Sequence, residues 1–154
     1  MRATWSERGT IRYLGAPPGM AFTTPGASAA EPEVTARRFL ESQRNRFGLG
    51  NPALGLRVFR TRQSGERHFV RLQETLSGVP IFGAMASVQL DGEGGVEAVI
   101  ADLSGIDASI DIRPGIPASQ AAEQARIRVR GSDPARTIDI RPPALHLWVP
   151  SVLG

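Results

Sequence analysis

The fold is predicted best by one stretch of sequence, Arg67–Leu90, which reads RHFVRLQETLSGVPIFGAMASVQL. Apolar and polar residues alternate through most of it, and this period of two is typical of half-buried β-strands. The first apolar set is Val70, Leu72 and Leu76; the second is Phe82, Ala84, Ala86, Val88 and Leu90. Between the two sets, Ser77-Gly78 predicts a tight turn because glycine accepts positive φ without strain. We therefore expect an antiparallel hairpin.

The same alternation extends the predicted sheet on both sides of this hairpin. Upstream, Leu54, Leu56 and Val58 share one face, and a turn at residues 63–66 leads into the hairpin. Downstream, the glycine-rich residues 91–95 predict a second turn, followed by a strand over residues 96–103. The expected sheet is a four-stranded antiparallel meander.

A helix is predicted over residues 32–47, immediately before the sheet. Pro32 suits the first turn of a helix, where its missing N–H is not needed, and Gly48 supplies a stop. One face of this helix would carry Ala36, Phe39, Leu40, Gln43 and Phe47. A helix that covers one face of an antiparallel sheet is an α+β arrangement. Residues 1–31, with prolines and glycines from position 16 onward, are predicted to be an extended lead-in.

The C-terminal part, residues 105–154, predicts a connection and an incomplete second unit. A helical pattern opens at Pro117 and ends at Gly131, and residues 138–149 alternate as a strand does. One helix and one strand cannot bury an apolar face by themselves. We expect this part to be truncated, or to be completed by packing on the first unit.

Composition limits the function classes. The chain has 154 residues, which is enough for about one domain. It has no cysteine, so disulfides and cysteine-type zinc sites are excluded. All 18 basic residues are arginine, and the net charge is only +3, so the pI of 10.8 overstates the basicity. Nucleic acid is therefore not the expected partner. No apolar run is long enough to cross a bilayer, and no membrane span is predicted.

A search for catalytic chemistry yields no catalytic, cofactor-binding or metal-binding residue. The two histidines, His68 and His146, lie far apart on separate predicted strands and have no further ligand at zinc spacing. Cysteine and lysine nucleophiles are absent, and the sequence has no Gly-x-Ser-x-Gly elbow. Glu74 is a lone carboxylate on an otherwise apolar strand face, where its pKa would rise, but pairing with an arginine is the more common arrangement. We expect no catalytic activity from this chain and no cofactor.

Several arginines gather in the first predicted hairpin, together with two phenylalanines. The set is Arg57, Arg60, Arg62, Arg67 and Arg71, with Phe59 and Phe69. Strict alternation would point Arg57 and Arg60 to opposite faces and split the stripe. An acidic protein partner and nucleic acid both remain open as explanations.

The hairpin also resembles a known family. Residues 71–83, RLQETLSGVPIFG, are similar to the Arg-x-x-Gln-x-x-x-Gly-Val-Pro-Val-x-Gly motif of fungalysin/thermolysin propeptide (FTP) domains, and residues 117–122, PASQAA, resemble the opening of a PepSY helix. The resemblance spans roughly residues 30–130. It implies structural roles for Arg71, Gln73, Glu74, Gly78, Val79, Pro80 and Gly83. Glu74 departs from the motif, which has glutamine at that position.

On this resemblance, residues 32–104 form a cystatin-like FTP domain and residues 105–154 a linker with a partial PepSY-like unit. The resemblance implies a non-catalytic propeptide of a secreted, thermolysin-like zinc metalloprotease. Such a propeptide acts as intramolecular chaperone and inhibitor, with the catalytic domain as its partner in cis or in trans. The alternative is a standalone extracytoplasmic FTP/PepSY module that regulates a protease or binds peptide in trans.

Overall fold

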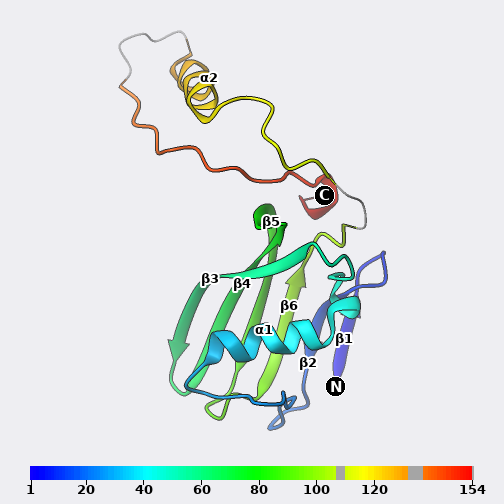
Figure 1. The fold of residues 1–154 in the computed structure, drawn as a ribbon. Helices are drawn as coiled ribbons and strands as arrows, with labels where there is room; N and C mark the ends of the chain where they lie inside the picture. Colours follow the sequence, from blue (N-terminus) through cyan, green and yellow to red (C-terminus); the bar gives the residue numbers. More distant parts are fainter. Residues whose placement is uncertain (107–109, 132–136, 154) are drawn as a thin grey trace.

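The computed structural model describes residues 1–106, 110–131 and 137–153, and its centre is an antiparallel sheet with one helix lying across a face (Figure 1). The sheet has six strands in the order β1-β2-β6-β5-β4-β3. The strands are β1 (Arg2–Trp5), β2 (Ile11–Gly15), β3 (Leu54–Ser64), β4 (Arg67–Leu76), β5 (Val79–Leu90) and β6 (Val96–Asp102). The helices are α1 (Pro32–Ser42), the 3-10 helix η1 (Arg44–Phe47), α2 (Ala118–Arg130) and the short α3 (Pro150–Leu153). The α+β class is confirmed.

The prediction of four strands was wrong, because the lead-in contributes two more. β1 and β2 form a hairpin within residues 1–31, and β2 pairs with the outer edge of β6, where Leu14 lies opposite Val99. Ile11 and Leu14 are 3% and 4% exposed, so this hairpin contributes to the core. Its strands are short, and its pairing partner lies more than 80 positions later in the chain, between Leu14 and Val99. No local pattern in residues 1–15 could indicate that partner.

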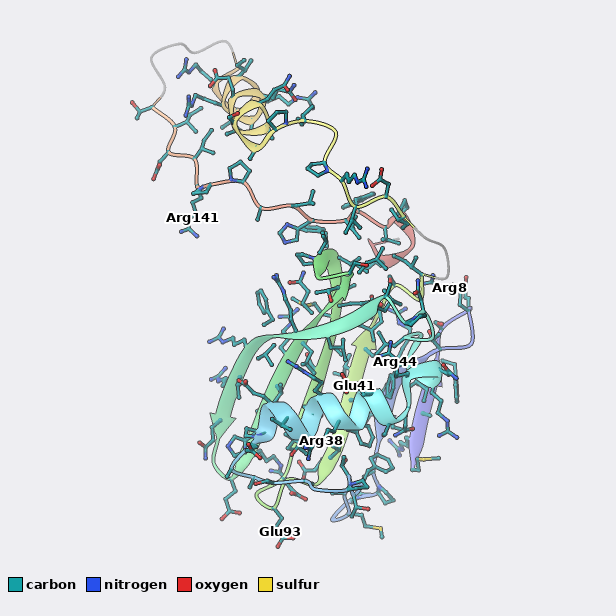
Figure 2. The ribbon with its side chains drawn as sticks, viewed as in Figure 1. Arg8, Arg38, Glu41, Arg44, Glu93 and Arg141 are labelled. Carbon is teal, nitrogen blue, oxygen red and sulfur yellow. The ribbon has the colours of Figure 1, made fainter. Side chains whose placement is uncertain are left out.

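The central hairpin forms where the alternation predicted it. Ser77 and Gly78 both have positive φ, 47° and 86°, as a two-residue turn of the mirror-image type requires. The second predicted turn is held by Asp91, whose Oδ1 accepts hydrogen bonds from the backbone N–H groups of Glu93 and Gly95 at 2.9 and 2.7 Å. Figure 2 shows Glu93 in this turn, at the end of the sheet opposite Arg8. These two turns connect β4 to β5 and β5 to β6 where the sequence predicted them.

The predicted helix over residues 32–47 is broken into α1 and η1 at Gln43. The Ser42 hydroxyl donates to the Phe39 carbonyl at 2.7 Å, and the Gln43 N–H bonds to the Leu40 carbonyl, so the last turn tightens. The predicted apolar face is otherwise confirmed. Ala36, Phe39, Leu40 and Phe47 are all at most 3% exposed. They pack on the inner sheet face with Val70, Leu72, Ala86, Val88, Val99 and other apolar residues of β2 to β6.

Among the described residues, the C-terminal part of the chain has less regular structure and less packing than the sheet. Helix α2 forms as predicted but has no buried residue, and it stands away from the sheet at the end of a long excursion of the chain (Figure 1). The strand predicted over residues 138–149 is reduced to an isolated bridge in which Leu147 pairs with Ile81 in parallel. Among the described residues, no helix has the length and apolar character needed to cross a membrane.

Candidate functional site

One residue of the hairpin motif, Gln73, has a buried side-chain amide. Its Oε1 accepts hydrogen bonds from Arg57 Nη2 and Nε at 2.7 and 3.3 Å, and its Nε2 donates to the Ile81 carbonyl at 3.2 Å. Gln73 is only 5% exposed, so leaving either end of the amide unpaired would be costly. The amide ties β3 to β5 across β4. These hydrogen bonds join three strands through one side chain.

The end of the motif creates an irregularity in β5. Gln73 lies opposite Met85 but Thr75 lies opposite Pro80, so β5 has extra residues at this point, and Gly83 adopts φ 81°. The extra residues reverse the alternation. Ile81 is completely buried and Phe82 is 51% exposed, whereas the sequence pattern placed Phe82 on the buried face. That prediction was wrong because a bulge shifts the side-chain period by one.

Phe82 consequently lies where the C-terminal segment returns to the sheet. Leu147 N–H donates to the Pro80 carbonyl at 2.9 Å, and Phe82 N–H donates to the Leu147 carbonyl at 2.8 Å. The Phe82 ring stacks on Trp148 with a centroid distance of 5.9 Å and meets His146 edge-on at 6.3 Å. This end of β5 extends past the end of β6, so its backbone groups are free to pair with another segment. We call Pro80–Phe82 the β5 end.

Glu74 is the only carboxylate in the buried core of the described residues. It is fully buried, and its Oε2 accepts a 2.7 Å hydrogen bond from the backbone N–H of Ser104, while its Oε1 has no hydrogen-bond partner. Burial raises the pKa of the Glu74 carboxyl above its ordinary value of 4.5, and the Ser104 hydrogen bonds and the charge of Arg8 offset only part of that rise. A buried acid with one free oxygen can hold a proton.

The arginines of the first hairpin are brought together rather than split. Strand β3 has a bulge between Val58 and Arg60: Arg57 lies opposite Gln73, Arg60 opposite Arg71, and Arg62 opposite Phe69. Thr61 points to the other face, where its hydroxyl donates to Glu33 of α1. The prediction that Arg57 and Arg60 point to opposite faces was therefore wrong. Arg67, the fifth member of the predicted cluster, is bound to Glu97 at 2.7 and 3.0 Å.

No metal-ligating cluster appears among the described residues. No group of three or more His, Cys, Asp or Glu side chains could hold an ion there. A depression of about 400 Å³ near the β1–β2 turn is lined by Ser6, Glu7, Arg8, Thr10, Arg12, Ala101, Asp102 and Leu103. Arg12 and Asp102 form an ion pair at 2.7 Å within it. The lining contains no histidine or cysteine to activate a substrate.

Comparison with known proteins adds no assignment: no protein-family model matches the sequence, and no curated protein matches it either.

Proposed function

We propose that this chain is a non-catalytic pro-region of a secreted, thermolysin-like zinc metalloprotease, in which it assists folding of the catalytic domain and inhibits it. The observation that carries the proposal is the contrast between the two units. The sheet and α1 form a unit with its own core, whereas α2 exposes Ile127 and Val129 at 63% and 52% and buries nothing among the described residues. An apolar helix face of this kind needs a partner. The catalytic domain, with the remainder of a PepSY-like unit, is the partner that the resemblance implies.

The hairpin supports the same proposal. Gly78, Pro80 and Gly83 occupy a turn, a strand start and a bulge, and Gln73 bridges Arg57 to the Ile81 carbonyl. These are roles for which the motif residues are suited: positive φ for glycine, and a position without a required N–H for proline. Such roles support a motif that acts on folding, as in a chaperone-like domain.

The coding sequence that follows Gly154 tests the proposal most directly. A His-Glu-x-x-His motif with a further glutamate ligand would identify the catalytic domain. That domain would then be refolded alone and with this chain added in trans, and the recovery of peptidase activity would be measured. Greater recovery with the chain present, followed by inhibition at excess, is the expected result. A stop codon close behind Gly154 would contradict the proposal.

A second candidate is the standalone module that binds an extended peptide, and the β5 end favours it. Leu147 already forms two backbone hydrogen bonds there, the way an added strand is recognised by a sheet edge. A module of this kind would exchange its own segment for a peptide. The chain would be titrated with extended peptides while the NMR signals of the Ile81 and Phe82 amides are monitored. This titration distinguishes a peptide-binding module from a pro-region.

A further inference from the structure

Four arginines of β3 and β4 form one exposed basic surface on the side of the sheet away from α1. We define the arginine face as Arg57, Arg60, Arg62 and Arg71. All four side chains are exposed, and among the described residues none forms an ion pair. At the outward positions of β4 and β5 next to them lie Gln73, Phe69, Met85, Ser87 and Gln89, so no carboxylate balances the charge from these strands.

The arrangement has an energetic cost in the free protein. Arg60 and Arg71 lie directly opposite each other on neighbouring strands, and like charges at such positions are destabilising. Arg71 is drawn over the ring of Phe59, with its guanidinium carbon 6.0 Å from the ring centroid, which relieves part of the repulsion. An anion placed between the two guanidinium groups would remove the rest. The pair is therefore suited to bind an anion.

The spacing of the arginine positions along and between the strands fits an extended polypeptide. Arg60 and Arg62 are two residues apart on a strand, which corresponds to about 7 Å, and Arg71 is one strand away, about 5 Å. Carboxylates at alternate positions of an extended segment repeat at the same distance of about 7 Å. Arginine binds such groups with two parallel hydrogen bonds. A depression of about 200 Å³ lies between these side chains, lined by Arg60, Arg62, Phe69, Val70, Arg71 and Ser87, and the half-exposed ring of Phe69 provides apolar contact.

We propose that the arginine face is a docking surface for an acidic, extended polypeptide segment of a partner protein, with acidic residues at alternate positions. Nucleic acid fits less well. The guanidinium of Arg71 already lies over one face of the Phe59 ring and competes with a base for that face, and the net charge of +3 provides little long-range attraction for a polyanion. The proposal does not depend on the pro-region function, since any partner with such a segment would fit.

The test measures binding of a fluorescein-labelled ten-residue peptide of alternating glutamate and threonine by fluorescence anisotropy at low salt. A triple variant, R60Q/R62Q/R71Q, is compared with a matched control, R126Q/R128Q/R130Q, which removes the same charge from helix α2. Exposed ion pairs contribute weakly, so losing three is expected to weaken binding about tenfold. The control variant should bind as the unchanged protein does. A peptide with the same five glutamates in one block should bind less tightly.

Several results would overturn the proposal. Equal weakening in both triple variants would mean that only net charge matters, and no binding of the peptide by the unchanged protein would remove the site. Tighter binding of an oligothymidylate with the same number of charges would point to nucleic acid instead. The arginines could also serve only to protect the β3 edge from pairing with other sheets. In that case the R60Q/R62Q/R71Q variant would self-associate in light scattering while peptide binding stayed unchanged.

Discussion

Replacing Glu74 by glutamine tests how the core tolerates a carboxyl group. Glutamine has nearly the same shape, and its carbonyl can accept the hydrogen bond that the Ser104 N–H now donates to Glu74 Oε2 at 2.7 Å. What the substitution removes is the ability to ionise. Any change in stability that depends on pH and differs between the two proteins therefore comes from the Glu74 proton.

The expected pH dependence follows from the raised pKa of Glu74. In the unfolded chain the carboxyl loses its proton near its ordinary pKa of 4.5, whereas in the folded protein burial keeps the proton on to higher pH. Between these two pKa values the folded state binds more protons, so the free energy of unfolding of the unchanged protein falls as pH rises. The loss reaches about 1.4 kcal/mol per pH unit in that window. Below pH 4.5 both proteins carry a neutral group at this position and should differ by less than about 1 kcal/mol.

The assay is urea unfolding from pH 4 to pH 8, followed by far-ultraviolet circular dichroism, because Trp5 and Trp148 are 55% and 63% exposed and report poorly on the core. E74Q should become progressively more stable than the unchanged protein as pH rises. The lowered pKa of Glu97, caused by its hydrogen bonds from Arg67 and Gln89, acts in the opposite direction but equally in both proteins. E93Q, in the exposed turn, is the matched control. A stability difference between E74Q and the unchanged protein that stays flat across this range would refute the reasoning.

Three further predictions follow from the geometry. Gly94 has φ 89°, and a Cβ there would lie 2.9 Å from the Ser28 carbonyl carbon, whereas a Cβ at Gly78, φ 86°, would meet nothing within 4 Å. G78A should therefore cost about 1–2 kcal/mol in thermal unfolding, and G94A roughly 1–3 kcal/mol beyond that; equal costs would contradict the close approach. F82A should remove the stacking on Trp148, worth about 0.5–1.5 kcal/mol, and speed hydrogen exchange at the Leu147 amide while leaving β4 unchanged; an unaltered Leu147 rate would show that the ring does not hold the segment. Amides of α2 should exchange much faster than those of β4 and β5, because a helix of 13 residues without packing is marginal; uniform protection would show that α2 has a partner.

The parts of the fold that were predictable are those whose signals are local. The hairpin of β4 and β5 combines long alternation with a turn dipeptide, and Ser77-Gly78 adopts the two positive φ values that such a turn requires. The buried face of α1 follows from its period, since Phe39 and Leu40 come three and four residues after Ala36. In both cases the residues that decide the structure are neighbours in sequence, so no knowledge of distant contacts is needed.

The missed parts depend on partners far along the chain. β1 and β2 become strands because β6 offers an edge to Leu14, and the only sign in the sequence is a short alternation among charged residues. Leu147 can pair with the β5 end because β6 ends before it would pair with Pro80. Neither strand length nor edge position is encoded locally. Propensity and periodicity indicate whether a segment forms a strand, but they do not indicate which strand edge it will pair with.

The arginine face depends on a single residue in the same way. The inward positions of β3 are Leu54, Leu56 and Val58 before the bulge and Thr61 after it, a spacing of three where alternation requires two. The first half of β3 is held by its buried leucines, and the second half by the hydrogen bond from Thr61 to Glu33. Both contacts can form together only if one residue between them, Phe59, is left unpaired. That residue moves Arg60 and Arg62 to the face that already carries Arg57 and Arg71. Because Thr61 is polar, the pattern of apolar residues gives no sign that it points inward. A prediction from that pattern alone therefore places Arg57 and Arg60 on opposite faces, whereas the bulge places them on the same face.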